Sequence, residues 1–435
     1  MTIFAEKMTA AGSQASGKQP LRVESDAESI IAEVAARVAM LDARDECIVF
    51  DLGDGIRFAV DMARKAVVRD PALDHAAIVT LTMEPRRMAR IMNRAVEPRF
   101  GLLFGWLTFS GRIEAGMRLC DELAGRRFQP DEILSDLAVP APTTDWKLAR
   151  KQLREYGYCI IKGALGEQEL QAVRTRLDQQ AAAEREAEIA YRDGGRGASK
   201  ERRGYRGDDT SEDEASADET APNQRIWCLY NKGQEFIDLM EHPVVTDIIC
   251  DYLDEDHPLC AIFSANIIGG GAEAQFLHQD QTAVNPGAPF GMGVNCVFCL
   301  DDFVEANGAT RVVPGSHIEE NGLRPDNIYS IKGTSCAVAP AGSAILFDMR
   351  LWHAGGASKP DAGLRRAVIL TIQRSWTRGA TNGVLSVRPE VFANMSDKIK
   401  SMLGFRVTDG LGSIQTEPEG TMIGWNPDQL VPRMG

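Results

Sequence analysis

Apolar residues in the N-terminal part of the chain recur first at helical spacing and then at strand spacing. The capping-box pattern Ser25-Asp-Ala-Glu28 precedes Ile30, Ile31, Val34 and Val38, and it predicts that a helix begins there. Turn residues then separate three short apolar runs, which predict an antiparallel meander of strands at Cys47–Leu52, Ile56–Met62 and Ala66–Arg69. A further strand is predicted at Ala77–Met83, where apolar and polar residues alternate, and Glu84-Pro85 begins the next amphipathic helix.

The pattern changes beyond Ala138–Thr144, where two prolines among small residues disfavour both helix and central strand. A strand and turn are predicted at Tyr156–Gly163, and a helix begins near Gly166. From Ile226 to Trp376 the chain is a series of short apolar runs bounded by turn residues, which is typical of a β-sandwich or barrel without a helix of convincing length.

A chain of 435 residues is too long for one ordinary core, because single cores stop growing at about 250–300 residues. We therefore expect a flexible N-terminus at 1–24, a first domain at 25–137, a linker at 138–144 and a second domain at 145–435. The stretch 192–222 is rich in charged residues, Gly and Ser and almost lacks large aliphatic side chains, so it is expected to be a disordered insertion or a mobile lid.

Charge and cysteine usage narrow the class of protein. The formal net charge of −14 disfavours a nucleic-acid partner, because the chain repels phosphate backbones. No secretory signal pattern and no run of about 18 apolar residues is present, and nine dispersed cysteines favour reduced thiols, so a cytoplasmic location without a transmembrane segment is expected. Cys296 and Cys299 form a CxxC within a predicted buried strand, where they would face opposite ways rather than form a redox or zinc site.

The six histidines provide the candidate chemistry. In His278-Gln-Asp280, residues two apart on an extended chain point to the same side and can bind one ion. His353 follows the predicted buried strand Ser343–Trp352 and precedes two glycines, which leave room for a ligand. Together these residues form the two-His-one-carboxylate set that leaves coordination positions open on iron(II). His317 is expected to cap a turn, and His75, His242 and His257 are expected to be solvated.

The C-terminal part of the chain resembles the phytanoyl-CoA dioxygenase family. The resemblance spans Asp145 to Arg378 and rests on several separate motifs in the family's order: Tyr156-Gly-Tyr-Cys-Ile-Ile161, His278-Gln-Asp280, Leu300-Asp-Asp-Phe-Val-Glu-Ala-Asn-Gly308, Val313-Pro-Gly-Ser-His317, and Leu346-Phe-Asp348 through His353 to Arg365-Arg-Ala367. It implies a mainly β double-stranded β-helix, or jelly roll, with flanking helices. It also implies iron(II), 2-oxoglutarate and O2 as cofactors, with ascorbate as an accessory reductant.

The resemblance assigns the cosubstrate to further residues. An arginine suits the distal carboxylate of 2-oxoglutarate because its planar fork donates two hydrogen bonds and stays charged. Arg365 matches the family's arginine better than its neighbour Arg366, and only one of the two can face inward from a strand. Thr310 matches a threonine that contacts the same carboxylate, and Gln275 matches a polar contact. Strand parity would place Gln275 opposite His278 unless a bulge intervenes.

The N-terminal part resembles the sterol carrier protein type two domain. The order of elements is the family's, with strands around Phe50-Asp-Leu-Gly-Asp-Gly55, then Val79-Thr-Leu-Thr82, a Met-rich amphipathic segment, and Phe109-Ser-Gly-Arg-Ile113 before a last helix. The resemblance implies a small α+β, lipid-carrier-like domain with a tunnel for a hydrophobic ligand. The alternative is a closed core filled by Met88, Met92, Phe100, Phe104 and Trp106.

The predicted function is oxidation, foremost hydroxylation, of a hydrophobic small molecule such as a lipid, terpenoid or polyketide. Desaturation, rearrangement and peroxide formation use the same cofactors and remain open, as does a catalytically silent lipid-binding or transfer protein. Halogenation is disfavoured, because halogenating relatives replace the carboxylate that Asp280 provides. The fused domain is expected to deliver substrate, to form part of a homodimer interface, or only to solubilise the enzyme. Arg225 and Trp227 are candidates for the mouth of the barrel, although plain core is the preferred assignment for Trp227.

Overall fold

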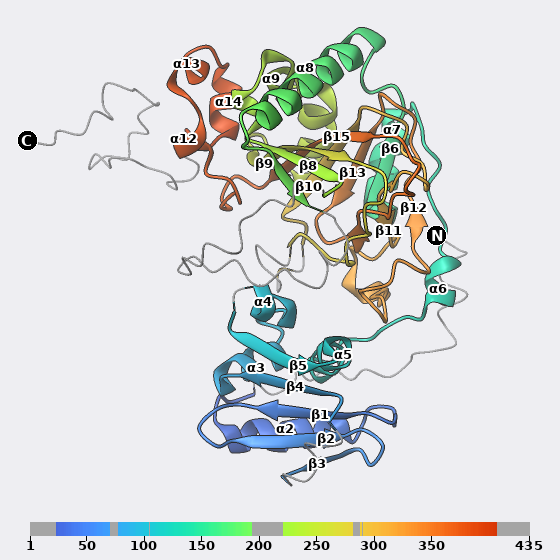
Figure 1. Ribbon diagram of the computed structural model, residues 1–435, viewed down its shortest axis with the longest axis vertical. Helices are drawn as coiled ribbons and strands as arrows, with labels where there is room; N and C mark the ends of the chain where they lie inside the picture. The colour runs from blue at the N-terminus through green and yellow to red at the C-terminus, as the bar shows by residue number, and fades with distance from the viewer. Residues whose placement is uncertain are drawn as a thin grey trace, which may run out of the picture.

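The computed structural model describes residues 23–69, 77–103, 105–193, 221–281, 288 and 290–406 (Figure 1). Nearly all of the predicted flexible N-terminus and of the charged insertion lies outside the described residues. The same holds for His75 and Phe104 and for the side chain of Phe100.

The N-terminal part contains a five-stranded sheet in the order β3-β2-β1-β4-β5. The strands are β1 (Cys47–Asp51), β2 (Arg57–Asp61), β3 (Ala66–Val68), β4 (Val79–Met83) and β5 (Leu107–Gly111). The predicted meander β1–β2–β3 is confirmed, and β4 then returns parallel to β1 with Ile48 opposite Val79. One core cluster joins this sheet to the helices α2 (Ala27–Val38), α3 (Pro85–Met92) and α5 (Ile113–Leu123), so this part of the chain is α+β.

The first helix begins as the sequence predicts, but its cap differs by one residue. Asp26 is the N-cap and its carboxylate accepts a hydrogen bond from the Ser29 backbone N–H, so the predicted cap at Ser25 is wrong. Both residues have side chains that can cap a helix, and the local backbone selects the aspartate. A short helix, α4 (Pro98–Leu103), precedes β5, and two further helices follow α5: α6 (Asp131–Ser135) and α7 (Trp146–Tyr156), which is capped by Asp145.

Two antiparallel sheets form the C-terminal part. The major sheet has the order β6-β13-β10-β15-β9-β8-β7, with β6 (Tyr158–Ile161), β7 (Tyr191–Asp193), β8 (Asn223–Trp227), β9 (Leu259–Ile268), β10 (Gly293–Cys299), β13 (Ala344–Asp348) and β15 (Arg365–Gln373). The minor sheet has the order β12-β11-β14, with β11 (Arg311–Val312), β12 (Ser335–Cys336) and β14 (His353–Ala354). This sheet-rich core is consistent with the predicted jelly roll.

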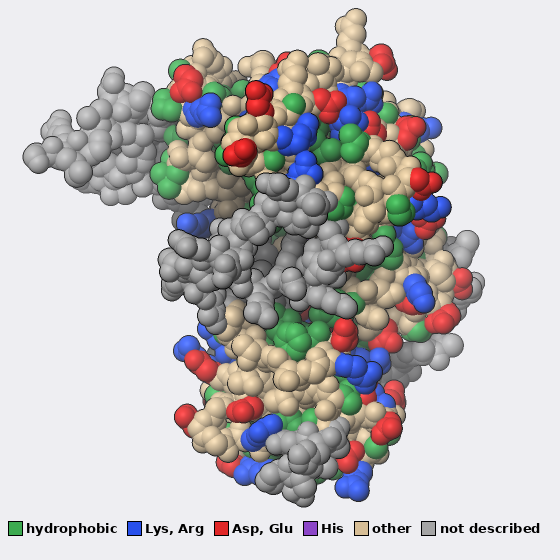
Figure 2. Space-filling view, viewed as in Figure 1, with side chains coloured by type: hydrophobic (Ala, Val, Ile, Leu, Met, Phe, Trp, Pro, Cys, Tyr) green, Lys and Arg blue, Asp and Glu red, His purple; other side chains and the backbone are tan. Residues whose placement is uncertain are grey.

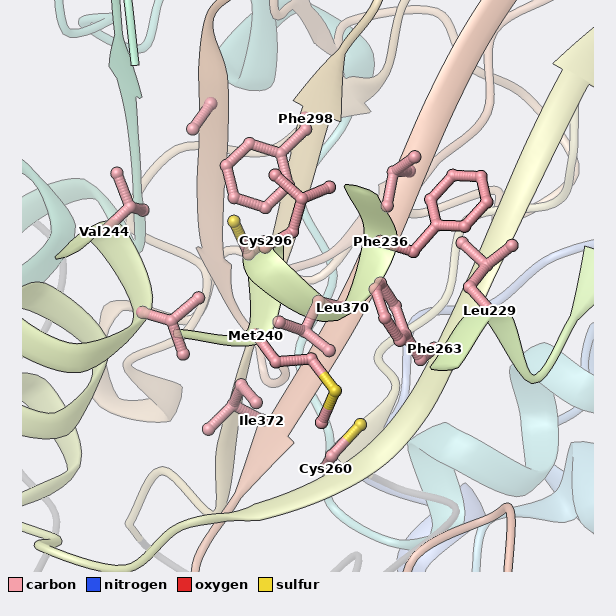
Figure 3. Packing of buried hydrophobic residues seen from close by; sticks show 14 of the residues in the cluster. Leu229, Phe236, Met240, Val244, Cys260, Phe263, Cys296, Phe298, Leu370 and Ile372 are labelled. Atoms are coloured by element: carbon pink, nitrogen blue, oxygen red, sulfur yellow. The ribbon is translucent and has the colours of Figure 1, made fainter. Parts of the chain in front are cut away.

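The major sheet is buried on both faces. Its outer face packs against helices, including α8 (Glu167–Glu186) and α9 (Gln234–Met240), in a cluster that contains Phe236, Phe263 and Phe298 (Figure 3). Its inner face packs against the minor sheet. Cys296 belongs to the outer cluster and Cys299 to the inner one, and burial raises the pKa of both thiols. The predicted opposite orientation of these two free cysteines is confirmed.

A helical segment interrupts the region predicted to contain only strands. Helix α9 is followed by a π-helical turn at Val244–Ile249 and by α10 (Cys250–Leu253). Phe236, Leu239 and Met240 recur at helical spacing and cover the outer face of the major sheet. The short helix lengths and the π-turn, which departs from a 3.6-residue repeat, obscured this periodicity in the sequence.

His242 lies between these helices and is buried, so its predicted solvation is wrong. Its Nε2 lies 3.0 Å from the carbonyl of Ala164, its Nδ1 accepts from the Val244 N–H, and its ring meets Phe298 edge-on. A buried imidazole is stable here because both of its nitrogens are hydrogen-bonded.

On the face of the molecule shown in Figure 2, Lys and Arg side chains are interspersed with Asp and Glu. Among the helices of the described ranges, none has the length and apolar character needed to cross a bilayer.

Candidate metal centre

Two backbone segments distant in sequence bring His278, Asp280 and His353 together. The N–H of each histidine donates to the carbonyl of the other, at 2.9 and 3.0 Å, which forms an isolated antiparallel bridge. The predicted strand leading to His353 ends earlier than expected, at Asp348, and His353 lies instead on β14 after a turn. β14 pairs with β11, with Val312 opposite His353, so the minor sheet fixes the position of this side chain.

The three side chains converge on one point. The Nε2 atoms of His278 and His353 lie 3.4 and 3.5 Å from the two oxygens of Asp280, and one ligand atom from each residue lies within 4.8 Å of the others. The Nδ1 atoms of His278 and His353 lie 2.9 and 3.0 Å from the carbonyls of Phe276 and Leu351. Because a carbonyl only accepts, each Nδ1 donates, which leaves Nε2, the atom that faces Asp280, as the ring nitrogen available to bind a metal ion. This arrangement can hold a divalent metal ion.

The carboxylate of Asp280 is oriented by a chain of buried hydrogen bonds. Asn295 on β10 donates from Nδ2 to Asp280 Oδ2 at 2.8 Å, and Thr371 on β15 donates to Asn295 Oδ1 at 2.6 Å. Burial alone favours the neutral carboxyl, but the adjacent imidazoles and Asn295 outweigh it and hold the pKa of Asp280 well below its usual range. The group is therefore an anion with one fixed orientation at neutral pH.

The three residues line a cavity of about 740 Å³ that extends over the inner face of the major sheet. Along β15 the alternate residues Arg365, Ala367, Ile369, Thr371 and Gln373 all face it. Arg365 is at the start of this row, Thr371 is beside the Asn295–Asp280 pair, and Trp376 lies beyond its far end. The cavity thus has a cationic end and an end with aromatic residues, with the three converging side chains between them.

Arg365 is a buried cation that forms no ion pair with the described residues. Its side chain faces the cavity, its Nε is buried without a hydrogen-bond partner, and its guanidinium lies 4.5 Å from the centre of the Phe303 ring. Burial lowers the pKa of Arg365 to about 10. Arg366 has the opposite orientation and pairs with Asp178 at 2.7 Å and with Asp301 at 3.0 Å. Of the two adjacent arginines, Arg365 can therefore receive an anion inside the cavity.

The other predicted cosubstrate contacts also face the cavity. Thr310 is buried just before β11. Gln275 lines the cavity on the same side as His278, because residues 272–277 form no regular strand and the parity rule does not apply to them. Its Oε1 accepts from the Gly355 N–H at 2.9 Å, which ties it to the segment after His353.

Further cavity residues include some that the sequence did not identify. Asn295, Thr371 and Trp376 had no local motif to mark them, because their roles depend on the pairing of β10 with β15 and on the loop after β15. Arg225 and Trp227 do reach the cavity. Trp227 is 46% exposed, so its preferred assignment as plain core is wrong.

His317 lies outside this site. Its Nε2 is 3.1 Å from the carbonyl of Arg154, so it donates to the backbone of α7 and not, as had been expected, to its own turn. It is also buried, which lowers its pKa. His257 does not line the cavity either.

A family model matches the region that contains these residues. Residues 153–367 match the family model Phytanoyl-CoA dioxygenase (PhyH). The chain is 26% identical over 271 residues to "Dioxygenase af480" of Aspergillus fumigatus, covering 60% of this chain and 77% of that protein. It is 30% identical over 178 residues to "Dioxygenase aneA" of Aspergillus aculeatus, covering 39% of this chain and 58% of that protein.

Other curated relatives are matched over about half of their own length, as with "Multifunctional dioxygenase prhA" of Penicillium brasilianum at 32% identity and 48% of its length. Among solved structures, the chain is similar to the "non-heme alpha ketoglutarate dependent carbocyclase SnoK from nogalamycin biosynthesis" with a TM-score of 0.40 and 21% identity. That match covers 57% of this chain and 95% of the other.

Proposed function

We propose that this chain, whose residues 153–367 match the phytanoyl-CoA dioxygenase family model, hydroxylates an apolar small molecule as an enzyme that depends on iron(II), 2-oxoglutarate and O2. The observation that carries the proposal is the unpaired, buried guanidinium of Arg365 in the same cavity as His278, Asp280 and His353. A buried charge is costly without a partner, so a site that retains one is suited to an anionic ligand.

We propose His278, Asp280 and His353 as the iron ligands. Two imidazole nitrogens and one carboxylate suit iron(II), and they leave further coordination positions for ligands that react. The donor set fits, because both Nε2 atoms and a carboxylate whose orientation is fixed converge within 4.8 Å of one another. Bound iron(II) supplies the oxidising power for the reaction, by activating O2 while 2-oxoglutarate is converted to succinate and carbon dioxide.

We propose that Arg365 binds the distal carboxylate of 2-oxoglutarate, with Thr310 as a further donor. Arg365 can form a bidentate, charge-assisted pair with a carboxylate, and this would satisfy the Nε that now has no partner. Gln275 is proposed to border the same ligand, since its side chain lines the cavity and is held by Gly355. The cosubstrate would then extend from the start of β15 toward Asp280.

The remainder of the cavity is proposed to bind the apolar substrate. Its wall beyond Thr371 includes Met292, Met349 and Trp376, and Trp227 on β8 also lines the cavity. Both tryptophans are 46% exposed, and large exposed aromatic residues beside a cavity are typical of ligand-binding surfaces. A hydrophobic molecule bound there would shield the oxidising centre from water.

We propose that residues 25–137 form a sterol carrier protein type two-like domain, joined by the linker 138–144. The helix, the meander and the parallel return of β4 support this assignment. Met88 and Met92, which could line a ligand tunnel, are 0% and 3% exposed and belong to the core of this region.

A turnover assay tests the proposed function. Protein loaded with iron(II) is supplied with 2-oxoglutarate in air, and succinate is measured with a sterol, a polycyclic terpenoid or an aromatic polyketide, and with free proline as the polar control. We expect iron-dependent succinate release that rises several-fold with at least one apolar compound. With ¹⁸O2, that compound should gain one labelled oxygen. Absence of iron-dependent succinate with every compound would contradict the enzyme activity, whereas efficient oxidation of proline would contradict only the substrate class.

Asn295 offers a test of how the carboxylate ligand is held. Asn295→Ala removes the side-chain hydrogen bond that β10 donates to Asp280 Oδ2. Affinity for Mn²⁺ is therefore expected to fall about 10- to 100-fold, the usual effect of losing a group that orients a metal ligand. Calorimetric titration of the metal-free protein measures this. Thr371→Val is the matched control, because it removes only the bond to Asn295 and should have a smaller effect. Equal affinity in Asn295→Ala and wild type would show that Asp280 does not depend on it.

A further inference from the structure

The segment between β11 and β12 packs against the residues that lead into His278. Leu277, which precedes His278, donates its N–H to the carbonyl of Ile328 at 2.7 Å, and the ring of Phe276 lies 6.4 Å from that of Tyr329. This segment therefore contacts the backbone that positions the first histidine.

A small hydrophobic cluster joins both histidine segments to that covering segment. It contains the chain neighbours of the two histidines, Leu277, Trp352 and Ala354, together with Val313. Leu134 of α6, which precedes the linker, is fully buried in the same cluster. The residues on both sides of His353, Trp352 and Ala354, therefore share one cluster with Leu134, which precedes the linker.

Arg324 lies over this cluster and connects it to the N-terminal part. Its guanidinium carbon is 4.7 Å from the centre of the Trp352 ring. Its Nη2 contacts Asp121 Oδ2 at 2.5 Å and Glu97 Oε2 at 3.5 Å. Trp352 is adjacent to His353, so one side chain contacts both the metal segment and two acids from the N-terminal part.

The acids and Arg324 belong to a network that is buried and balanced in charge. Arg126 pairs with Glu97 and with Asp121, and the side chains of Glu97, Asp121, Arg126 and Arg324 are between 4% and 12% exposed. Two cations therefore face two anions. Such a network adds little net stability, but removing one member would leave an uncompensated buried charge. Because that loss is costly, the four side chains are strongly held in this one arrangement.

We infer that Arg324 is a positioning residue for His353, held in place by Asp121 and Glu97, so the N-terminal part of the chain is a component of the metal centre. This inference rests on the proposed iron site. The backbone around Arg324 has its own anchor, because the Gln129 N–H donates to the Arg324 carbonyl at 2.8 Å and the Asp326 N–H donates to the Gln129 carbonyl at 3.1 Å. Replacing the Arg324 side chain should therefore release Trp352 without detaching the segment.

The test uses the full chain and Mn²⁺ as the probe. The double variant Asp121→Asn/Arg324→Met keeps the network neutral and removes the guanidinium from Trp352. We expect its Mn²⁺ affinity, measured by calorimetry on metal-free protein, to fall about tenfold, because groups that support metal ligands typically contribute 10- to 100-fold. The thermal midpoint of the metal-free variant should stay within a few degrees of wild type.

Glu319→Gln is the matched control, because it breaks Arg94–Glu319, an exposed ion pair between the same two parts of the chain, and it should leave Mn²⁺ affinity unchanged. If the double variant does not fold, Arg324→Lys serves instead. It preserves the charge but cannot stack as a planar group on the indole while pairing with Asp121, so weaker Mn²⁺ binding is again expected.

The outcomes separate this inference from the proposed metal site. Wild-type affinity in a folded Arg324 variant, with binding lost in His353→Ala, would overturn the positioning role alone. Binding of Mn²⁺ that is unaffected by His353→Ala would overturn the metal site and this inference with it.

Discussion

His353→Ala is expected to reduce iron-dependent succinate formation more than about 1,000-fold and to weaken Mn²⁺ binding more than about 100-fold, which exceeds the usual effect of losing a group that only supports a ligand. His353 is the ligand that the minor sheet fixes most firmly, through the pairing of β14 with β11 and the two backbone bonds to His278. Its loss leaves one imidazole and one carboxylate, which do not complete the three-residue set.

The control for this variant is His257→Ala, since His257 lies outside the cavity. It should retain wild-type activity and Mn²⁺ affinity. Calorimetric titration and a succinate assay on both variants, with circular dichroism to establish folding, measure the comparison. Retention of activity by folded His353→Ala would exclude the proposed ligand set.

Arg365→Met is expected to raise the KM for 2-oxoglutarate about 100-fold, because truncating one partner of a buried charge pair costs about 2–5 kcal/mol. It should also raise the thermal midpoint of the ligand-free protein. Burial lowers the pKa of Arg365 to about 10, so the charged form that predominates at neutral pH is disfavoured in the folded protein, and a methionine removes that penalty. Binding and stability should therefore change in opposite directions.

Arg366→Met provides the matched control at the adjacent position. Arg366 faces outward and pairs with Asp178 and Asp301, so its loss should lower the thermal midpoint and leave the KM for 2-oxoglutarate within about twofold of wild type, as for a remote surface change. Steady-state kinetics and differential scanning calorimetry on the two variants provide the measurement. A raised KM in Arg366→Met with a normal one in Arg365→Met would reverse the assignment.

The parts of the site that sequence could predict depend on short-range patterns. The i, i+2 spacing of His278 and Asp280 and the alternation that turns Arg365 inward and Arg366 outward are local rules, and the structure places all four side chains accordingly. The strands of the first meander also follow from alternation and turn residues, without knowledge of their neighbours.

Features that depend on contacts distant in sequence could not be predicted. Asn295 supports Asp280 only because β10 lies beside the segment after His278, and no motif near Asn295 indicates this. The parity rule failed for Gln275 because residues 272–277 leave regular strand geometry. Burial of His242 required knowledge that the helical segment at 234–253 packs on the outer face of the sheet, where Phe298 contacts the imidazole.

The proposed metal centre lies where the major and minor sheets meet. Asp280 is tied to β10 of the major sheet through Asn295, whereas His353 belongs to β14 of the minor sheet. A metal ion bound by these side chains would cross-link the two sheets. Because it would bind only the folded protein, it would stabilise the fold by RT ln(1 + [ion]/Kd). The lifetime of this enzyme should therefore follow the supply of iron. Cells starved of the metal would lose the protein itself to proteolysis as well as its activity.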